Sequence, residues 1–219
     1  MLQRNIHTYT IAEQLDLHKA KAIVLGVGGG GCCMAEILAR TGVGNITLVD
    51  FDTFEDSNKN RQIGALDSTI GKSKVEVMGR RLKDINPSCK ITTVFDKISE
   101  SNYKELLEDK DIILDAVDKA ANKIMVCDFV KDLNKTYVSG GLGGYYNWTA
   151  ILANKHVKSI VGMEDGGSVY PCASGVFMQA SMEAQQGIDL YLGRGTKYHL
   201  DKIIKINQVT LAMSVEEII

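Results

Sequence analysis

The sequence predicts an α/β protein whose Rossmann-like, doubly wound sheet is mostly parallel and ends in antiparallel C-terminal strands. Apolar runs of strand length alternate with stretches of helical periodicity over the first two thirds of the chain. A glycine-rich turn joins the first strand to the first helix, and strand-like segments follow one another closely in the last third. Strands separated by helices favour parallel pairing, because the helix provides the crossover that a parallel pair needs.

The first unit consists of a strand, a turn, a helix and a second strand. Residues 21–27 form a short apolar run, residues 32–40 are rich in apolar side chains, and residues 46–49 are again apolar. Together these segments occupy about thirty residues, which is the size of one βαβ unit. The sequence therefore predicts that the turn lies between two parallel strands.

The alternation of helices and strands continues along the chain. Helical spacing at residues 74–85 predicts a helix, and the β-branched residues 90–95 predict a strand. Ser99 is placed to cap a helix over residues 100–108.

Three further elements complete the parallel part of the predicted sheet. They are a buried strand at residues 112–114, a helix at residues 120–133 and a strand at residues 136–139. Since each strand is followed by a helix, we expect helices to cover both faces of the sheet.

The last third of the chain has a different pattern. Residues 148–153 and 157–163 are both strand-like with a short break between them, which predicts that they pair antiparallel. Residues 175–192 are predicted to form a long helix closed by Gly193, and residues 203–215 to form one or two terminal strands. There is no repeat, low-complexity tract or linker, so residues 1–219 are predicted to form a single domain.

Composition excludes several classes of protein. The formal net charge is only -2 and the basic residues are spread along the chain, so nucleic acid is not indicated as a partner. The N-terminus lacks the layout of a signal peptide and no apolar run approaches membrane-spanning length, which predicts a cytoplasmic protein without a membrane partner. The five cysteines contain no CxxC pair, which disfavours a structural zinc site.

The glycine turn predicts a nucleotide site. Residues 26–31 read Gly-Val-Gly-Gly-Gly-Gly and fit GxGxxG between an apolar strand and a helix. Asp50 closes the next strand, where its carboxylate can accept hydrogen bonds from ribose hydroxyls. NAD, FAD and ATP all present an adenosine and a phosphate to such a turn, so the turn and Asp50 leave the nucleotide open.

The segment after this strand decides between the nucleotides. It brings an arginine, amides and a lysine close to the nucleotide, and these residue types neutralise and orient a triphosphate. A nicotinamide dehydrogenase has no use for them. The residues are Asp52, Asn58, Asn60, Arg61, Gln62 and Lys74.

Asp118 lies just beyond the end of a later buried strand, where open α/β sheets bind ligands. Its carboxylate could hold magnesium. Simpler interpretations exist, in which Asn58 and Asn60 cap a turn, Lys74 lies on a solvated helix face and Asp118 caps the following helix. The order of these residues behind a dinucleotide-type turn favours the nucleotide interpretation.

At this point the chain resembles the ThiF/MoeB/HesA superfamily, relatives of the ubiquitin-activating enzymes. The resemblance rests on GxGGxG, D-x-D, S-N-x-x-R-Q, K-x-E and D-x-x-D between Gly26 and Asp118. It implies an ATP-dependent adenylyltransferase that activates the C-terminal carboxylate of a small ubiquitin-like sulfur carrier ending in Gly-Gly, with release of pyrophosphate. A carboxylate is already ionised at neutral pH, so this step needs no general base.

The resemblance also implies roles for individual residues. Arg61, Lys74 and Asp118 would be catalytic, and Asp118 would hold magnesium. A homodimer is implied, in which Arg4 is the candidate for an arginine that reaches the partner's ATP. The implied nucleotide contacts are Gly26, Gly28, Gly29, Gly31, Asp50, Asp52, Asn58, Asn60, Arg61, Gln62, Lys74 and Asp118.

The chain departs from the family pattern in two places. Many relatives carry two CxxC pairs and a reactive cysteine on a crossover loop, whereas here Cys172 is only a candidate thiol near that position. Lys119 stands where the family has an asparagine after the aspartate.

Three alternative functions remain open from the sequence. One is a tRNA threonylcarbamoyladenosine dehydratase-like enzyme, because residues 60–66 and 85–89 resemble that protein closely. The second is a non-catalytic nucleotide-binding dimer module, and the third is a nicotinamide oxidoreductase. We favour the carrier-activating enzyme because the last third of the chain resembles carrier-activating members and has no basic tract for tRNA.

Overall fold

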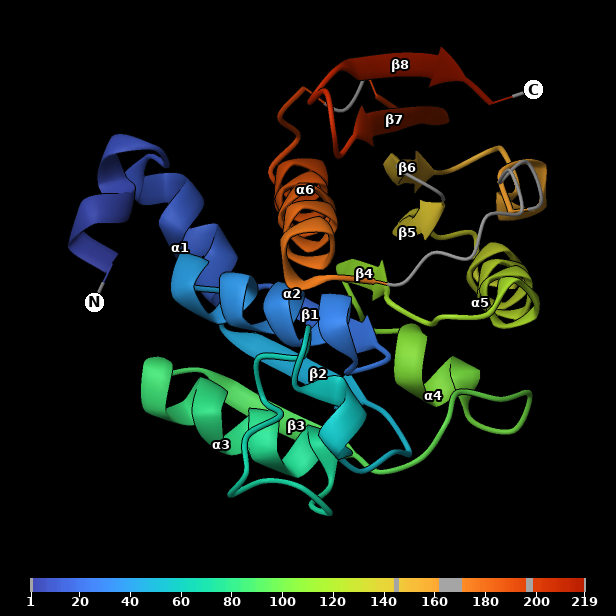
Figure 1. Ribbon diagram of the computed structural model, residues 1–219. Coiled ribbons are helices and arrows are strands. Elements are labelled where there is room, and N and C mark those ends of the chain that lie inside the picture. Colours follow the sequence, from blue (N-terminus) through green and yellow to red (C-terminus); the bar gives the residue numbers. More distant parts are fainter. Residues whose placement is uncertain (1, 144–145, 162–170, 196–198, 219) are drawn as a thin grey trace.

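The computed structural model describes residues 2–143, 146–161, 171–195 and 199–218, and within them an eight-stranded sheet with helices on both faces (Figure 1). The strand order is β3-β2-β1-β4-β5-β6-β7-β8. The strands are β1 (Lys21–Leu25), β2 (Asn45–Val49), β3 (Lys90–Val94), β4 (Ile112–Asp115), β5 (Tyr137–Gly143), β6 (Tyr146–Leu152), β7 (Lys202–Asn207) and β8 (Met213–Glu217).

The described part of the chain also contains six α-helices and three short 3-10 helices, of which η1 and α1 precede the first strand. The α-helices are α1 (Ile11–Lys19), α2 (Gly29–Thr41), α3 (Lys74–Ile85), α4 (Tyr103–Leu107), α5 (Ala120–Asp132) and α6 (Ala173–Tyr191). The 3-10 helices are η1 (Leu2–His7), η2 (Asp56–Asn58) and η3 (Val157–Ser159). None of these helices is both long enough and apolar enough to cross a membrane.

The pairing confirms the predicted fold class. Strands β1 to β5 are parallel to one another, and β6, β7 and β8 continue the sheet in antiparallel pairs. The order runs outward in both directions from β1 and β4, so the chain reverses direction across the sheet at that pair. In open α/β sheets the crevice at such a reversal, outside the carboxyl ends of the strands, is where ligands bind.

Strand β1 is buried on both faces, as expected in the centre of a parallel sheet. Ala22 and Val24 pack into one core cluster, which includes side chains of α1, α2, α3 and α6. Ile23 and Leu25 pack into the other cluster, which includes side chains of α4 and α5. Alternate side chains of this one strand thus contribute to the cores on both faces of the sheet.

Two predicted helices begin at a different residue in the structure. Helix α2 begins at Gly29 instead of residue 32, because the glycines form its first turn. Helix α4 begins at Tyr103 instead of residue 100, and its N-cap is Asn102. Ser99 does not cap this helix, because its backbone N–H instead donates to Asn102 Oδ1 at 2.8 Å.

The strand predicted over residues 157–163 is wrong in its described part, and residues 162–163 lie outside the described residues. Val157–Ser159 form η3, which His156 caps by accepting a hydrogen bond from the Lys158 N–H. Val157 and Ile160 are buried one helical turn apart, so their apolar character reflects a 3-10 spacing and not strand alternation. Strand β6 therefore pairs antiparallel with β5 and β7.

The remaining segments follow the sequence closely. The long helix predicted near the C-terminus is α6, and Gly193 follows it with a positive φ of 69°. The terminal segment forms two antiparallel strands, β7 and β8.

Candidate active site

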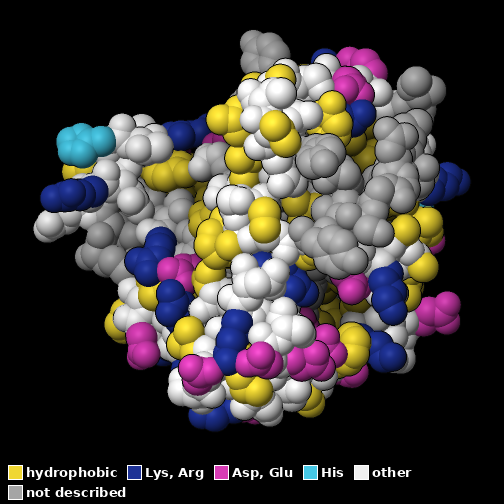
Figure 2. Space-filling model, in the orientation of Figure 1, with side chains coloured by type: hydrophobic (Ala, Val, Ile, Leu, Met, Phe, Trp, Pro, Cys, Tyr) yellow, Lys and Arg dark blue, Asp and Glu magenta, His cyan; other side chains and the backbone are white. Residues whose placement is uncertain are grey.

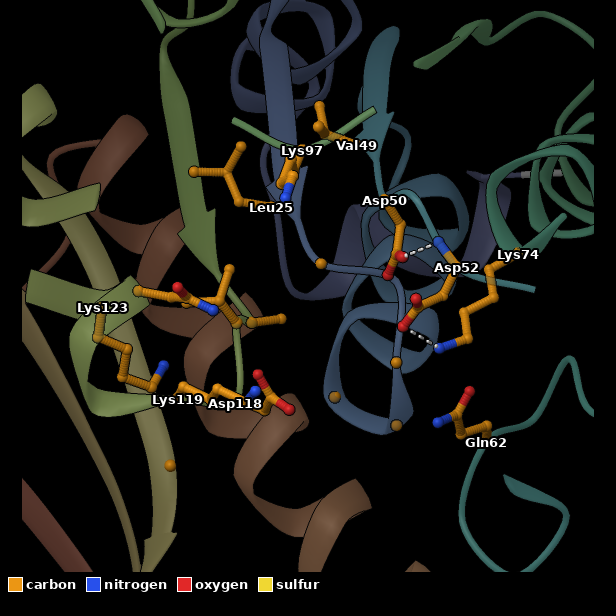
Figure 3. Close-up of a pocket in the computed structure, with 18 of the residues that line it drawn as sticks. Leu25, Val49, Asp50, Asp52, Gln62, Lys74, Lys97, Asp118, Lys119 and Lys123 are labelled. Carbon is orange, nitrogen blue, oxygen red and sulfur yellow. Dashed lines mark hydrogen bonds and ion pairs between the residues drawn. The ribbon is translucent and has the colours of Figure 1, made fainter. Parts of the chain in front are cut away.

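A cleft of about 980 Å³ opens at the carboxyl ends of β1, β2 and β4 (Figure 3). Its walls come from the glycine turn, the loops after β2, β3 and β4, the start of α5, the far end of β5 and the first turns of α6. The predicted site residues that line it are Gly26, Gly28, Gly29, Asp50, Asp52, Asn58, Arg61, Gln62, Lys74 and Asp118.

The glycine turn exists because backbone segments approach one another too closely for side chains. Gly26 has a φ of 88°, and a Cβ there would lie 2.8 Å from the carbonyl oxygen of Ala116. A Cβ on Gly31 would lie 1.9 Å from the carbonyl oxygen of Gly26, so Gly31 supports the turn from beneath and does not line the cleft.

The first turn of α2 offers unpaired backbone donors to the cleft. The backbone N–H of Cys32 donates to Gly28 O at 3.0 Å, so the N–H groups of the preceding glycines lie at the open end of the helix. The helix dipole adds about half a positive charge at this end. This end of α2 is therefore suited to bind an anion such as a phosphate.

Asp50 ties the turn to the loop after β2. Its Oδ2 accepts from the Val27 N–H at 2.6 Å, and its Oδ1 accepts from the Asp52 N–H at 2.8 Å. The residue is buried, with 8% of its surface exposed. Each carboxylate oxygen retains a lone pair, so Asp50 can shape the turn and still accept from a ribose hydroxyl.

Lys74 does not lie on a solvated helix face. It begins α3, which Ser73 caps, and its side chain is only 8% exposed. Its Nζ lies 3.2 Å from Asp52 Oδ2, and its backbone N–H donates to Asp52 O at 3.1 Å. The ammonium group thus enters the cleft already oriented by Asp52, as the dashed line in Figure 3 shows.

Asn58 and Arg61 come from the short helix η2 and the turn after it. Asn58 is buried, and its Oδ1 accepts from the Glu55 N–H at 3.1 Å. Arg61 Nη1 donates to Ser57 O at 3.1 Å and to Asn60 Oδ1 at 2.7 Å. These bonds occupy one nitrogen of the guanidinium group and leave Nε and Nη2 for an anion.

Asn60 and Gln62 are placed differently from each other. Asn60 does not line the cleft, because its Nδ2 donates to Pro171 O at 3.0 Å in the segment that enters α6. Gln62 is buried beside the glycine turn, and its Oε1 has no hydrogen-bond partner among the described residues. Its Nε2 lies 3.8 Å from the position a Cβ would take on Gly28.

Asp118 is exposed in the loop after β4 and does not cap α5, whose N-cap is Lys119 without a side-chain hydrogen bond. The structure describes no hydrogen bond or ion pair of the Asp118 side chain. Among the described residues no three His, Cys, Asp or Glu side chains gather as a metal cluster. Magnesium bound to phosphates needs only one or two protein carboxylates, so Asp118 fits such an ion as a single ligand.

The sequence analysis did not identify a buried polar network next to the loop after β4. Asp115 is fully buried, and its Oδ2 accepts from Lys123 Nζ at 3.3 Å and from Ser139 Oγ at 2.7 Å. Its Oδ1 accepts from the Val117 N–H at 3.1 Å, which fixes the loop that carries Asp118. The only sign of this network in the sequence is Asp115, the first aspartate of the D-x-x-D pattern. Its pairing with Lys123 depends on how α5 packs against β4, so the sequence alone does not predict it.

Comparison with protein families matches the model of the ThiF family to residues 2–218. The chain belongs to the ThiF family. Its sequence is 38% identical over 154 residues to a tRNA threonylcarbamoyladenosine dehydratase of Haemophilus influenzae, covering 69% of this chain and 59% of that protein. It is 31% identical over 192 residues to the adenylyltransferase and sulfurtransferase UBA4 of Eremothecium gossypii, covering 80% of this chain and 42% of that protein. The chain thus spans about half the length of these relatives.

Solved structures share the ThiF-type fold. Escherichia coli MccB with AMPCPP and MccA superposes with a TM-score of 0.86 at 22% identity, over 99% of this chain and 71% of that chain. The MccB structure with ATP gives a TM-score of 0.81 at 22% identity, over 95% of this chain and 66% of that chain. At this identity the likeness establishes the fold alone.

Two further residues predicted for this ThiF protein lie outside the cleft. Cys172 is exposed at the N-cap of α6, and its Sγ lies 3.2 Å from Ser174 Oγ. The hydrogen bond with Ser174 and the backbone N–H of Gly175 lower the pKa of Cys172 below its ordinary value. Arg4 is exposed in η1 and does not line the cleft of its own chain.

Proposed function

We propose that this ThiF protein uses ATP to adenylate a carboxylate and releases pyrophosphate. The observation that carries the proposal is the distribution of charge around the cleft. Free backbone N–H groups of α2, the Lys74 ammonium and the Arg61 guanidinium line the cleft, and the Asp118 carboxylate lies across it from Lys74 (Figure 3). This arrangement suits a polyphosphate together with a divalent cation. ThiF-family adenylyltransferases use ATP.

In the proposed reaction an oxygen of the substrate carboxylate attacks the α-phosphorus. The bond from that phosphorus to the bridging oxygen breaks, and pyrophosphate leaves with the electron pair. The carboxylate is ionised at neutral pH, so the protein contributes position and charge neutralisation instead of a general base. Lys74 and Arg61 would offset the developing charge, and Asp118 would hold magnesium, which would neutralise further charge on the phosphates.

The comparisons favour one substrate over the one we expected from the sequence. The dehydratases are the more similar relatives, with 38% and 37% identity for the proteins of Haemophilus influenzae and Escherichia coli. We therefore propose a tRNA-borne threonylcarbamoyl carboxylate as the first substrate to test. On the described part of the face in Figure 2, basic and acidic side chains are interspersed. This face therefore offers no basic patch that would support binding of tRNA.

A ubiquitin-like sulfur carrier ending in Gly-Gly remains the second candidate. The match to UBA4 covers 80% of this chain, compared with 69% for the dehydratase, so it reaches further into the sequence. A homodimer, a cytoplasmic location and a single adenylation domain over residues 1–219 also remain proposals.

The test is the conversion of ATP by the purified chain with magnesium and one candidate substrate at a time. Release of AMP and pyrophosphate only with modified tRNA would support the dehydratase-like function, and pyrophosphate exchange only with the carrier would support carrier activation. Tight binding of ATP without turnover of either would indicate a non-catalytic module. Tight binding of NAD in the absence of ATP binding would refute the proposal and leave an oxidoreductase.

A further inference from the structure

Helix α6 packs beside α2 and braces the glycine turn (Figure 1). A Cβ on Gly29 would lie 2.8 Å from Val176 Cγ1, and a Cβ on Gly30 would lie 3.1 Å from Gln179 Oε1. These two side chains of α6 therefore form the wall against which the first turn of α2 rests. Both also line the cleft.

The amide group of Gln179 is itself held in place by Glu183, one helical turn further along α6. Gln179 Nε2 donates to Glu183 Oε2, and only 5% and 0% of the two residues are exposed. A Cβ on Gly140 of β5 would lie 2.5 Å from each of these two atoms, so the strand leaves room for the pair. Because Nε2 is engaged by Glu183, Oε1 is the atom of Gln179 that faces Gly30.

Glu183 is an unusual residue for the inside of a helix–sheet contact. Its Oε1 has no hydrogen-bond partner among the described residues, although a buried acceptor without a partner lowers stability. Its charged and titratable neighbours are Asp115 from β4, Lys123 from α5 and Tyr137 from β5. Burial raises the pKa of Glu183 well above its ordinary value, because the charged carboxylate loses its contact with water.

We infer that Gln179, held by Glu183, is a positioning residue that fixes the first turn of α2 in the orientation that receives the phosphates of ATP. The inference rests on the proposed function for its ligand. In this arrangement α6, which begins after Cys172, sets the geometry of the nucleotide site through two buried polar side chains.

The test compares two glutamines of the same helix. Gln186 is also buried, but its Oε1 accepts from Thr149 Oγ1 at 2.5 Å and it does not line the nucleotide cleft. We expect Gln179→Leu to raise the Kd of ATP with magnesium about tenfold, and Gln186→Leu to leave that Kd within about twofold of the wild type. Isothermal titration calorimetry of the full chain measures both, and thermal melting shows how much each change lowers stability.

Glu183 provides a second comparison. Glu183→Gln keeps an oxygen that can accept from Gln179, so it should restore most of the ATP affinity that Glu183→Leu loses. Hydrogen exchange at the backbone amides of residues 29–33 supplies a readout that does not depend on ATP. We expect faster exchange there in Gln179→Leu and Glu183→Leu, and no change in Gln186→Leu.

The possible results separate this inference from the proposed function. A wild-type protein that does not bind ATP would refute the proposed function. Hydrogen exchange at residues 29–33 would still test the positioning role of Gln179. Wild-type Kd and wild-type exchange in Gln179→Leu would overturn the inference. Equal losses in Gln186→Leu would overturn it as well, because they would show a general loosening of α6.

Discussion

Removal of the Lys74 ammonium should separate activity from stability. Lys74→Met keeps the buried stem and deletes the charge. Two unit charges about 4 Å apart interact by about 4 kcal/mol at an effective dielectric constant of about 20. If half of this interaction is specific to the transition state, the loss in kcat/KM is about 30-fold, and the full value corresponds to about 1000-fold.

The same substitution should have little effect on folding. The partner in the ion pair, Asp52, has a side chain that is 50% exposed, so the pair contributes at most about 1 kcal/mol to stability. For a chain of this size that corresponds to a fall in Tm of about 2–4 °C. Lys72→Met is the matched control, because Lys72 is exposed two residues away and forms only backbone hydrogen bonds in the described structure.

The assay is substrate-dependent pyrophosphate exchange, with thermal melting of each variant alongside. We expect the Lys72 variant to match the wild type in both measurements. A Lys74 variant that keeps its kcat/KM within about threefold of the wild type would refute the charge argument. Equal losses of kcat/KM in the Lys72 and Lys74 variants would also refute it. They would show that the net positive charge of this region matters and that the position of the Lys74 ammonium does not.

Four other substitutions test separate parts of the site. Asp118→Asn should lower exchange at least about tenfold and raise the magnesium concentration required for half-maximal rate, measured by magnesium titration. Gly31→Ala should prevent stable folding, because its Cβ would lie 1.9 Å from a backbone oxygen, and circular dichroism or soluble yield would show this. Lys123→Met should lower the free energy of unfolding by about 3–5 kcal/mol in urea titration, because it leaves the fully buried Asp115 without its cation. Cys172→Ser should leave adenylation unchanged, while in the wild type the lowered pKa of the Cys172 thiol should let iodoacetamide modify it at a pH below the ordinary thiol range.

The parts of the fold that depend on local pattern could be predicted from the sequence. Apolar periodicity identified β1, α2 and β2, and the GxGxxG spacing placed the turn between them. The strand predicted over residues 157–163 was wrong in its described part, because a short apolar run is compatible with either a strand or a helical turn. Val157 and Ile160 are apolar and β-branched, but they are buried as one turn of a 3-10 helix against α5.

The part of the site that depends on tertiary contacts could not be predicted. Lys123 and Asp115 are eight residues apart in sequence, and only the packing of α5 against β4 brings the ammonium to the carboxylate. Gln179 and Glu183 lie in the predicted long helix, but nothing local indicates that β5 has a glycine opposite them. Asn60 belonged to the right segment but bonds to Pro171, because the entry to α6 passes over it.

Two parts of the cleft differ in what they contribute to the choice of substrate. The nucleotide side of the cleft is built by β1, β2 and the start of α3, and residues there serve any carboxylate that is to be adenylated. Gly141 and Leu142 of β5 line another part of the cleft, and we expect a second substrate to approach along this strand. Identity to relatives therefore ranks the two candidate carboxylates but does not show which residues select between them. Substitutions at Leu142 that leave the Kd of ATP unchanged but alter the preference between modified tRNA and carrier would locate substrate choice in β5.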